Sequence, residues 1–268
     1  MKPPLRGFLN YVGEILMQYV KLGNTGIEVS RLCFGGLIIG PLQANLPTAK
    51  GADVITKAME LGVNFVDTAE LYETYGHIRQ AIRKTGKKPV IATKSYAYDT
   101  DGAISSLEKA RKELDVDIID IFLLHEQESR HTLRGHREAL EYFMEAKEKG
   151  IIRAVGVSTH NVEVVEACSE MPEIDIIHPI VNRQGIGIGD GSIEDMLAAV
   201  KKSYDNGKGI YSMKPLGGGN LLGSYADSMD FVLNLPFIHS VAVGMQSVEE
   251  VIMNACVFEG KEVPGEII

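Results

Sequence analysis

The sequence lacks tryptophan, has only three cysteines among its 268 residues, and contains no long apolar run. The cysteines, Cys33, Cys168 and Cys256, stand far apart and form no CxxC spacing. An odd, scattered set is typical of reduced thiols in a cytosolic protein, and not of a disulfide framework or a metal site. Because no stretch of about 18 apolar residues exists, no transmembrane helix is expected. These absences predict a cytoplasmic protein without a bound metal.

Positive charge is also scarce, with 27 Lys and Arg against 36 Asp and Glu and a formal net charge of −9. Nucleic acids and anionic membrane surfaces both favour clustered Lys and Arg side chains. The sequence therefore predicts no nucleic-acid partner and no membrane partner. It stays compatible with an anionic cofactor, which needs only a local group of hydrogen-bond donors.

The first residues carry no clear targeting signal. The segment Phe8–Val20 is apolar in places, but it contains Glu14 and lacks a small-residue cleavage site. A signal peptide is therefore not expected, and Met17 is a natural first residue. We expect residues 1–16 to be a leader and residues 17–268 to form a single folded domain.

One alternation repeats along the chain: a short apolar, β-branched run, a polar turn, and a segment with helical periodicity. Continuous apolar runs are typical of parallel strands that are covered on both faces. The eight strand-like runs are Leu32–Gly36, Asn64–Ala69, Val90–Ser95, Ile119–His125, Ile152–Thr159, Ile174–Val181, Gly209–Pro215 and Ser240–Met245. The helical segments expected between them include Ala52–Leu61, Ser105–Leu114, Arg137–Lys149, Ile193–Tyr204 and Val248–Ala255.

The residues that flank the helical segments agree with this alternation. Gly62 and Gly150 stand where two of the helices should end, because glycine readily takes the left-handed conformation found there. Asn161 and Ser247 are predicted N-caps, since short polar side chains accept hydrogen bonds from the first free amides of a helix.

Eight strand–helix units predict a closed (β/α)8 barrel, which takes about 250 residues. An open doubly wound sheet is the alternative, but its GxGxxG fingerprint is absent, and the nearest match, Gly185–Gly191, has another spacing. Before the first barrel strand, Tyr19–Ser30 has two alternating runs around Gly23 and Gly26. This pattern indicates a β-hairpin, which we expect to plug the bottom of the barrel.

Polar residues follow three consecutive strands of the predicted barrel. Asp67 ends the second strand, Tyr72 follows it in the loop, Lys94 ends the third and His125 ends the fourth. Each has a structural explanation when taken alone, such as a turn cap, a packed ring or a wall residue. Chemistry in such barrels lies at the carboxyl ends of the strands, and a buried ammonium is costly unless it is paired. Together the four residues predict a catalytic site.

Four separated segments resemble the signature blocks of the aldo-keto reductases, in the same order and on consecutive strands. They are Asn64-Phe-Val-Asp-Thr-Ala-Glu-Leu-Tyr, Ile91-Ala-Thr-Lys, Leu123-Leu-His and Gly156-Val-Ser. The likeness spans roughly residues 17–254. The block Met213-Lys-Pro-Leu-Gly-Gly-Gly resembles a bacterial and archaeal branch, some members of which carry a cysteine-rich iron–sulfur segment that is absent from this sequence. The resemblance implies a barrel that reduces a small-molecule carbonyl with a nicotinamide cofactor.

The resemblance also implies a role for each of the four polar residues. Tyr72 would be the general acid in reduction and the general base in the reverse direction. A phenol has a pKa of about 10, and the Lys94 ammonium is expected to lower that pKa. Asp67 would keep Lys94 charged and aimed, while His125 would donate a hydrogen bond to the substrate oxygen.

The cofactor contacts are likewise implied by the resemblance. Ser158 and Thr159 would meet the nicotinamide carboxamide, His178 stands where the family commonly has Gln, and Met213 stands where an aromatic ring often stacks. Lys214 and the glycines after it offer donors to a pyrophosphate, with a plain turn as the alternative. The predicted cofactor residues are Gly35, Gly36, Ser158, Thr159, His178, Met213, Lys214, Leu216, Gly217, Gly218, Gly219, Gly244, Met245, Gln246, Glu250 and Asn254.

The choice between NAD(H) and NADP(H) depends on the stretch Gly244–Glu250. Relatives that prefer NADP carry basic residues there, whereas this chain has Glu250. A carboxylate repels a 2′-phosphate and accepts hydrogen bonds from ribose hydroxyls. We therefore expect NAD(H) or NADP(H), with NAD favoured, and we expect Asn254 near the adenine.

Three functions stay open at this point. A carbonyl reductase or alcohol dehydrogenase is favoured over a non-catalytic nicotinamide-binding redox sensor on the same barrel. The third is a barrel aldolase with Lys94 as the Schiff-base nucleophile, against which Asp67 would keep the amine protonated. The segment Glu126–Arg137, rich in Arg and His, is either an attractor of acidic substrates or a solvated surface patch.

Overall fold

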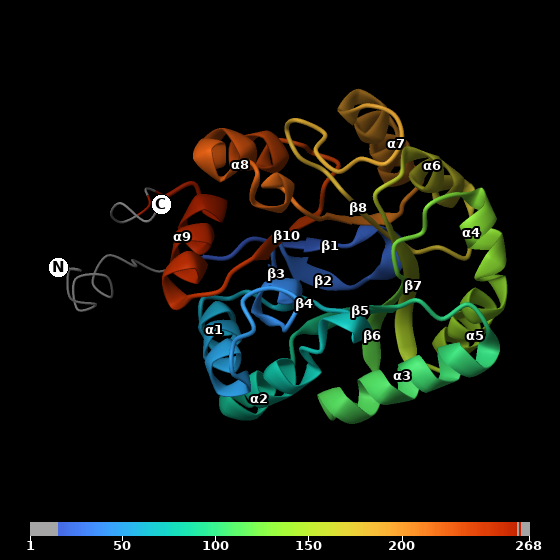
Figure 1. Cartoon of the computed structure of the whole chain (residues 1–268), viewed down its shortest axis with the longest axis horizontal. Coiled ribbons are helices and arrows are strands. Elements are labelled where there is room, and N and C mark those ends of the chain that lie inside the picture. The colour runs from blue at the N-terminus through green and yellow to red at the C-terminus, as the bar shows by residue number, and fades with distance from the viewer. Residues whose placement is uncertain (1–15, 262, 264–268) are drawn as a thin grey trace.

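The computed structural model describes residues 16–261 and 263, and a closed barrel of eight parallel strands forms its centre (Figure 1). The strands follow one another in chain order, and the last one closes the barrel by pairing with both the first and the seventh. The strands are β3 (Leu32–Gly35), β4 (Phe65–Asp67), β5 (Val90–Ser95), β6 (Ile119–Leu124), β7 (Ile152–Thr159), β8 (Ile176–Pro179), β9 (Gly209–Ser212) and β10 (Ser240–Gly244). The predicted (β/α)8 fold is confirmed.

The helices form an outer ring around the barrel, in chain order from blue to red in Figure 1. The α-helices are α1 (Thr48–Glu60), α2 (Tyr75–Thr85), α3 (Thr100–Leu114), α4 (Arg130–Gly135), α5 (Arg137–Glu148), α6 (Val162–Glu170), α7 (Ile193–Asp205), α8 (Tyr225–Leu233) and α9 (Val248–Phe258). Short 3-10 helices are η2 (Gly23–Thr25), η3 (Gly36–Ile39), η4 (Glu70–Tyr72), η5 (Gly217–Gly219) and η6 (Leu222–Ser224).

Strand β6 shows why these apolar runs form barrel strands. All six of its residues are buried, because side chains alternate between the two faces of a strand and both faces are covered. Phe122 and Leu124 pack outward with the helices, while Ile121 and Leu123 pack inward with residues from other strands. A continuous apolar sequence therefore fills two separate parts of the core.

The hairpin predicted at the amino end is present and closes one end of the barrel. Strands β1 (Tyr19–Lys21) and β2 (Glu28–Ser30) pair antiparallel. Three fully buried side chains, Leu22, Ile27 and Val29, pack with the inward-facing residues of the barrel strands. The inner core is thus continuous from the hairpin to the strands, as the sequence predicts.

Several observed strands are shorter than the sequence predicts, mostly at the end that carries the site. Strand β4 stops at Asp67, β8 at Pro179 and β9 at Ser212, two or three residues before the predicted ends, and β4 and β8 also begin one and two residues later than predicted. At this rim the backbone leaves the parallel ladder to form the loops that lead into the helices.

The predicted N-caps differ in outcome. Ser247 caps α9, because its side chain accepts from the amide of Glu250. Asn161 takes the N-cap position of α6, but its side chain makes no capping bond. The carboxylate of Asp190, from the loop before α7, accepts from the amides of Val162 and Glu163 instead.

The segment 126–137 is not the loop that the sequence suggests, because it contains α4 and leads directly into α5. Its basic side chains form exposed ion pairs, Arg130 with Glu163 and Arg137 with both Glu141 and Glu173. Carboxylates thus match Arg130 and Arg137, while Arg134 contacts the ring of His131.

The hairpin plug generates a stability prediction. Leu22→Ala should lower the free energy of unfolding by about 2–5 kcal/mol, since it opens a cavity in the inner core. Leu222→Ala removes a half-exposed side chain of the same kind and should change stability by no more than about 0.5 kcal/mol. Urea unfolding of both variants measures the difference, and equal losses would contradict the plug.

Candidate active site

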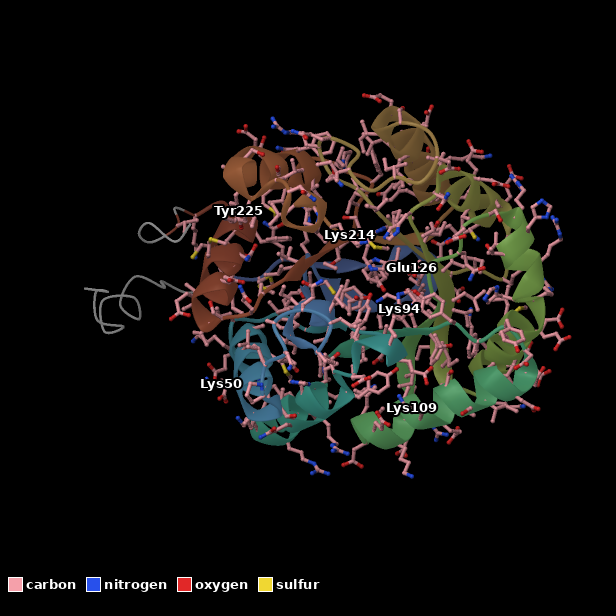
Figure 2. The ribbon with its side chains drawn as sticks, viewed as in Figure 1. Lys50, Lys94, Lys109, Glu126, Lys214 and Tyr225 are labelled. Carbon is pink, nitrogen blue, oxygen red and sulfur yellow. The ribbon has the colours of Figure 1, made fainter. Side chains whose placement is uncertain are left out.

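The barrel brings the four predicted catalytic residues to one rim. Asp67 ends β4, Lys94 is the last residue but one of β5, and His125 follows β6 directly. Tyr72 ends the short helix η4 that follows β4. Because all strands are parallel, their carboxyl ends meet at the same edge. In Figure 2, Lys94 lies near the middle of the molecule, far from peripheral residues such as Lys50.

Lys94 is the centre of the site. Its Nζ donates to Asp67 Oδ2 at 2.8 Å and to the backbone oxygen of Thr68 at 2.8 Å, and it reaches the Tyr72 hydroxyl at 3.5 Å. A lysine ammonium has three donors, so each is directed at an acceptor. Only 1% of the Lys94 surface is exposed, which leaves these three partners to replace water.

The ion pair with Asp67 keeps Lys94 charged. Burial by itself favours the neutral amine, but the Asp67 carboxylate and the Tyr72 hydroxyl outweigh that effect, and the pKa of Lys94 is raised above its ordinary value. An amine must lose its proton before it can attack a carbonyl carbon. The structure therefore speaks against Lys94 as a Schiff-base nucleophile.

The acid strength expected of Tyr72 needs a correction. Burial raises the pKa of Tyr72 above its ordinary value, and the Lys94 ammonium offsets only part of this effect. The ammonium acts in the predicted direction, but it does not bring the net pKa below that of a free phenol. Tyr72 is therefore fully protonated near neutral pH and available as a proton donor.

His125 is a neutral ring beside Tyr72. Burial, together with the charge of Lys94, lowers the pKa of His125 to about 2. Its Nε2 lies 3.5 Å from the Tyr72 hydroxyl, while Nδ1 is buried with no partner among the described residues. A proton on Nδ1 would be a buried donor without an acceptor, so this surrounding favours the tautomer with its proton on Nε2, facing Tyr72.

The second oxygen of Asp67 has a partner that sequence reasoning missed. Tyr211, on β9, donates from its hydroxyl to Asp67 Oδ1 at 2.9 Å. His178 stacks on the Tyr211 ring, with centroids 3.9 Å apart, and its Nε2 lies 3.6 Å from Asp67 Oδ1. Side chains two residues apart on a strand share a face. Because Met213 was predicted to meet the cofactor, Tyr211 could have been expected to point into the barrel as well.

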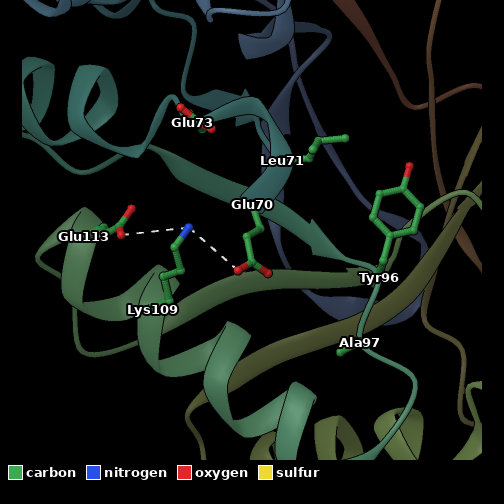
Figure 3. Close-up of a pocket in the computed structure, with 7 residues that line it drawn as sticks. All are labelled: Glu70, Leu71, Glu73, Tyr96, Ala97, Lys109 and Glu113. Atoms are coloured by element: carbon green, nitrogen blue, oxygen red, sulfur yellow. Dashed lines mark ion pairs between the residues drawn. The ribbon is translucent and has the colours of Figure 1, made fainter.

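A cavity of about 150 Å³ opens over the catalytic residues. Tyr72, Lys94 and His125 line it, together with Leu37, Leu42, Leu71, Tyr96, Glu126, Ser158, Met213 and Lys214. A larger cavity of about 590 Å³ lies beside it and shares Leu71 and Tyr96 with it. Figure 3 shows that the larger cavity is lined by acidic side chains, with Lys109 paired to Glu70 and Glu113. It contains none of the four predicted catalytic residues, so the smaller cavity is the candidate reaction site.

Tyr96 and Glu126 form one wall of the catalytic cavity. The Tyr96 ring stacks on His125 with centroids 4.5 Å apart, and its hydroxyl donates to Glu126. Sequence reasoning missed this wall, because both residues come from loops just beyond strands.

The residues predicted to meet the nicotinamide carboxamide are buried and already bonded. Ser158 Oγ accepts from the amide of Glu126 at 2.9 Å, and Thr159 Oγ1 donates to the backbone oxygen of Gln127 at 2.6 Å. Gln127 itself is 1% exposed, and its side-chain oxygen has no donor among the described residues. A buried amide oxygen without a donor fits an N–H group from a ligand.

The predicted pyrophosphate residues lie after β9. Lys214 lines the catalytic cavity, has a left-handed backbone, and bonds His160 Nε2 at 2.9 Å. Gly217, Gly218 and Gly219 also have left-handed backbones, and a Cβ at Gly218 or Gly219 would meet nothing within 4 Å. The space beside Gly218 and Gly219 is thus open, while the Gly219 amide donates to the backbone oxygen of Leu216 at 3.0 Å. Leu216 packs against the hydrophobic core beside them.

The rim of β3 needs glycine for close backbone approach. A Cβ on Gly35 would lie 3.1 Å from the backbone oxygen of Val243, and one on Gly36 would lie 2.8 Å from that of Asp67. On neighbouring β10, Gly244 is exposed, whereas the Met245 side chain is fully buried in the core.

The predicted adenosine end is occupied by local hydrogen bonds. Glu250 Oε2 accepts from the amide of Gln246 at 2.9 Å, next to the start of α9. Asn254 is 2% exposed, and its side chain bonds both Tyr225 and the backbone oxygen of Glu250. A contact between Asn254 and an adenine stays a prediction that requires these bonds to be exchanged.

The chain is thus a (β/α)8 barrel with an Asp–Tyr–Lys–His group at the carboxyl ends of its strands, an arrangement suited to acid–base catalysis. A model of the Aldo/keto reductase family matches residues 31–236, more than half of the chain. The chain therefore belongs to the aldo-keto reductase family, whose members are generally NAD(P)H-dependent oxidoreductases.

Individual relatives are distant. L-galactose dehydrogenase of Arabidopsis thaliana is 25% identical over 213 residues, which cover 75% of this chain and 66% of that protein. A rice protein (Oryza sativa subsp. japonica) named "Probable voltage-gated potassium channel subunit beta" is 26% identical over 230 residues, covering 78% and 67%. The chain spans about two thirds of the length of these relatives.

A solved structure supports the fold in the same way. An aldo-keto reductase from Bacillus halodurans, in its holo form, superposes with a TM-score of 0.74 at 20% identity, over 93% of each chain. Across the described residues, every helix is too short or too polar to cross a bilayer.

The buried histidines generate a prediction about acid stability. Burial lowers the pKa of His178 to about 4, so the unfolded chain binds a proton near pH 5 that the native site resists. The contribution of the neutral His178 ring to the free energy of unfolding is fully present above about pH 6.5. It is lost as the pH falls toward the pKa of His178 in the folded state. His178→Gln should therefore flatten the fall in unfolding free energy between about pH 6 and pH 5, by up to about 1.4 kcal/mol per pH unit.

Chemical denaturation at several pH values measures this slope. The exposed residue His131 supplies the control, because His131→Gln should leave the slope of the native chain unchanged. An unchanged slope in His178→Gln would show that the ring accepts a proton freely in the folded state.

Proposed function

We propose that the protein is an NAD(P)H-dependent carbonyl reductase that converts an aldehyde or ketone to an alcohol, with Tyr72 as the general acid. One observation carries this proposal: the buried Lys94 ammonium is paired with Asp67 and directed at the Tyr72 hydroxyl. Burying a charged pair costs several kcal/mol of desolvation. A pair in this position, on the floor of a cavity, supports a catalytic use.

The reaction needs a proton on oxygen and a hydride on carbon. The Tyr72 phenol donates its proton to the carbonyl oxygen, and the Lys94 ammonium stabilises the phenolate that remains. His125 donates a hydrogen bond from Nε2 to the same oxygen and holds it against Tyr72. A bound nicotinamide supplies the hydride. In the reverse direction the Tyr72 phenolate takes the proton back from the alcohol.

The donor and acceptor groups around the cavity fit a nicotinamide dinucleotide. The unpartnered oxygen of Gln127 would accept from the carboxamide N–H, beside Ser158. The amide of Gly218, in a turn where a Cβ would meet nothing within 4 Å, with the Lys214 ammonium, would receive the pyrophosphate. Met213, which lines the catalytic cavity, would offer an apolar surface to the nicotinamide ring.

Glu250 supports a preference for NAD over NADP. It stands in the first turn of α9 beside Glu249, and two carboxylates there would repel a 2′-phosphate dianion. Ribose hydroxyls, by contrast, are hydrogen-bond donors that a carboxylate accepts.

A cofactor-binding redox sensor is the second candidate. Relatives from rice and Arabidopsis thaliana are named as probable potassium channel subunits, so not every relative is named as an enzyme. The four catalytic residues favour the enzyme, because a sensor has no need of a buried acid–base group. Carbonyl-dependent turnover separates the two functions, since a sensor would bind the dinucleotide without multiple turnovers.

Tyr72→Phe tests the assignment of the general acid. The variant should bind NADH nearly as well as the native chain but lose about a hundredfold or more in kcat, because positioned acid catalysis supplies factors of this size. Steady-state rates with small aldehydes measure the loss. The exposed Tyr98 provides the control, as Tyr98→Phe should keep full activity. A loss of less than about tenfold in Tyr72→Phe would refute the acid role.

Cofactor preference is tested by fluorescence titration of NADH and NADPH. We expect NADH to bind at least as tightly as NADPH, and we expect Glu250→Gln to strengthen NADPH binding while NADH binding stays similar or weakens. A clear preference of the native chain for NADPH would contradict the role given to Glu250.

A further inference from the structure

Tyr211 packs among the inward-facing residues of the barrel and bonds Asp67. We propose that Tyr211 is a positioning residue whose hydroxyl holds the second oxygen of Asp67, and that it thereby controls how much of the Lys94 charge is available to Tyr72. The inference rests on the proposed function, because it concerns the same acid–base group. Tyr211 is not among the site residues that were predicted from the sequence.

The two oxygens of the Asp67 carboxylate accept from two different side chains. Lys94 Nζ donates to Oδ2 at 2.8 Å and the Tyr211 hydroxyl donates to Oδ1 at 2.9 Å. Asp67 is 5% exposed and Tyr211 is completely buried, so no bulk water is available to replace either donor. Hydrogen bonds to a charged acceptor are about twice as strong as neutral ones.

The completely buried Tyr211 ring is held by two ring contacts, so its hydroxyl cannot turn elsewhere without disrupting the core. It stacks on His178 at an interplanar angle of 17° and makes a T-shaped contact with Phe65, with centroids 4.9 Å apart. His178 Nδ1 in turn donates to the backbone oxygen of Tyr211 at 2.6 Å. Burial, reinforced by Asp67, raises the pKa of Tyr211 far above its ordinary value. Tyr211 therefore remains a phenol and a donor.

Removal of the Tyr211 hydroxyl would change the charge balance at Tyr72. Oδ1 of Asp67 would lose its donor, and its uncompensated charge would attract Lys94 more strongly. Lys94 would then stabilise the Tyr72 phenolate less, and the phenolate would form only at higher pH.

The other groups around the two residues do not reverse this direction. Tyr72 is also faced by the neutral His125 and by the carboxylate of Glu126. Asp67 is also faced by His178, which burial keeps neutral, and by the thiol of Cys33, whose pKa burial raises. The neutral His178 directs its Nδ1 proton at the Tyr211 backbone oxygen, and a thiol such as that of Cys33 is only a weak donor, so neither matches the Tyr211 hydroxyl.

A direct test follows the titration of Tyr72 without any substrate. The full chain is produced with difluorotyrosine, which makes each phenol more acidic, and fluorine NMR follows each ring against pH. Tyr72→Phe assigns the Tyr72 resonance. Tyr211→Phe should move the Tyr72 midpoint upward by about half a unit or more. An unchanged midpoint in Tyr211→Phe would overturn the inference.

Tyr75→Phe is the matched control, because it also deletes a buried hydroxyl. That hydroxyl bonds Thr93 Oγ1 at 2.7 Å and makes no hydrogen bond to Asp67. The Tyr72 midpoint should stay where it is in this variant. A shift equal to that of Tyr211→Phe would mean that general loosening of the core, and not the bond to Asp67, moves Tyr72.

A second measurement keeps the Tyr211 hydroxyl in place. Asp67→Asn should shift the fluorine resonance of Tyr211, since the charged acceptor of its hydroxyl is lost, and an unmoved resonance would overturn the contact. The NMR results do not depend on turnover. If Tyr72→Phe keeps its activity while the Tyr72 midpoint moves in Tyr211→Phe, the proposed function fails and the positioning contact stands.

Discussion

The buried ion pair between Lys94 and Asp67 is the interaction on which the site depends. A charged ammonium with 1% of its surface exposed is tolerated only because every donor has an acceptor within reach. Those acceptors are the Asp67 carboxylate, the Thr68 backbone oxygen and the Tyr72 hydroxyl. The pair keeps Lys94 protonated. The Lys94 ammonium in turn lowers the pKa of Tyr72, which offsets part of the larger rise that burial causes.

The barrel supplies this pair through simple strand geometry. Residues two apart on a strand face the same side, so each inward catalytic residue stands above an inward core residue of its own strand. Phe65 lies below Asp67, Ala92 below Lys94, and the hairpin plug fills the space beneath. Apolar packing fixes the polar rim from below, while the rim itself stays open as a small cavity.

The sequence predicted the eight strands well, and it marked four polar residues that the fold brings to one rim, because both follow from local patterns. Continuous apolar runs identify strands that are buried on both faces. A polar residue such as Lys94 at the end of such a run is easily recognised. The signal for Tyr211, its place two residues before Met213, was weaker, since a tyrosine inside an apolar strand is ordinary core material until the fold places Asp67 beside it. Asn161 likewise fits a cap by type, but the bond comes from Asp190, which is distant in sequence.

The acid strength of Tyr72 could not be derived from residue types for a related reason. The sequence shows that a cation follows nearby, whereas the burial of Tyr72, which raises its pKa more than Lys94 lowers it, exists only in the folded chain. Cofactor preference likewise depends on contacts that exist only in the folded chain. The sequence predicts that Glu250 places a negative charge at the adenosine end. In the folded chain this carboxylate also accepts a hydrogen bond from the Gln246 amide, next to the start of α9.

The most direct test of the account is the rate of NADH and NADPH oxidation with a panel of aldehydes and ketones, compared between the native chain and Lys94→Met. Methionine keeps the length and apolar stem of lysine without its charge. The account predicts carbonyl-dependent oxidation by the native chain and its near-complete loss in the folded Lys94→Met variant. Turnover that survives in Lys94→Met, or a native chain that binds the cofactor but turns over no carbonyl, would contradict it.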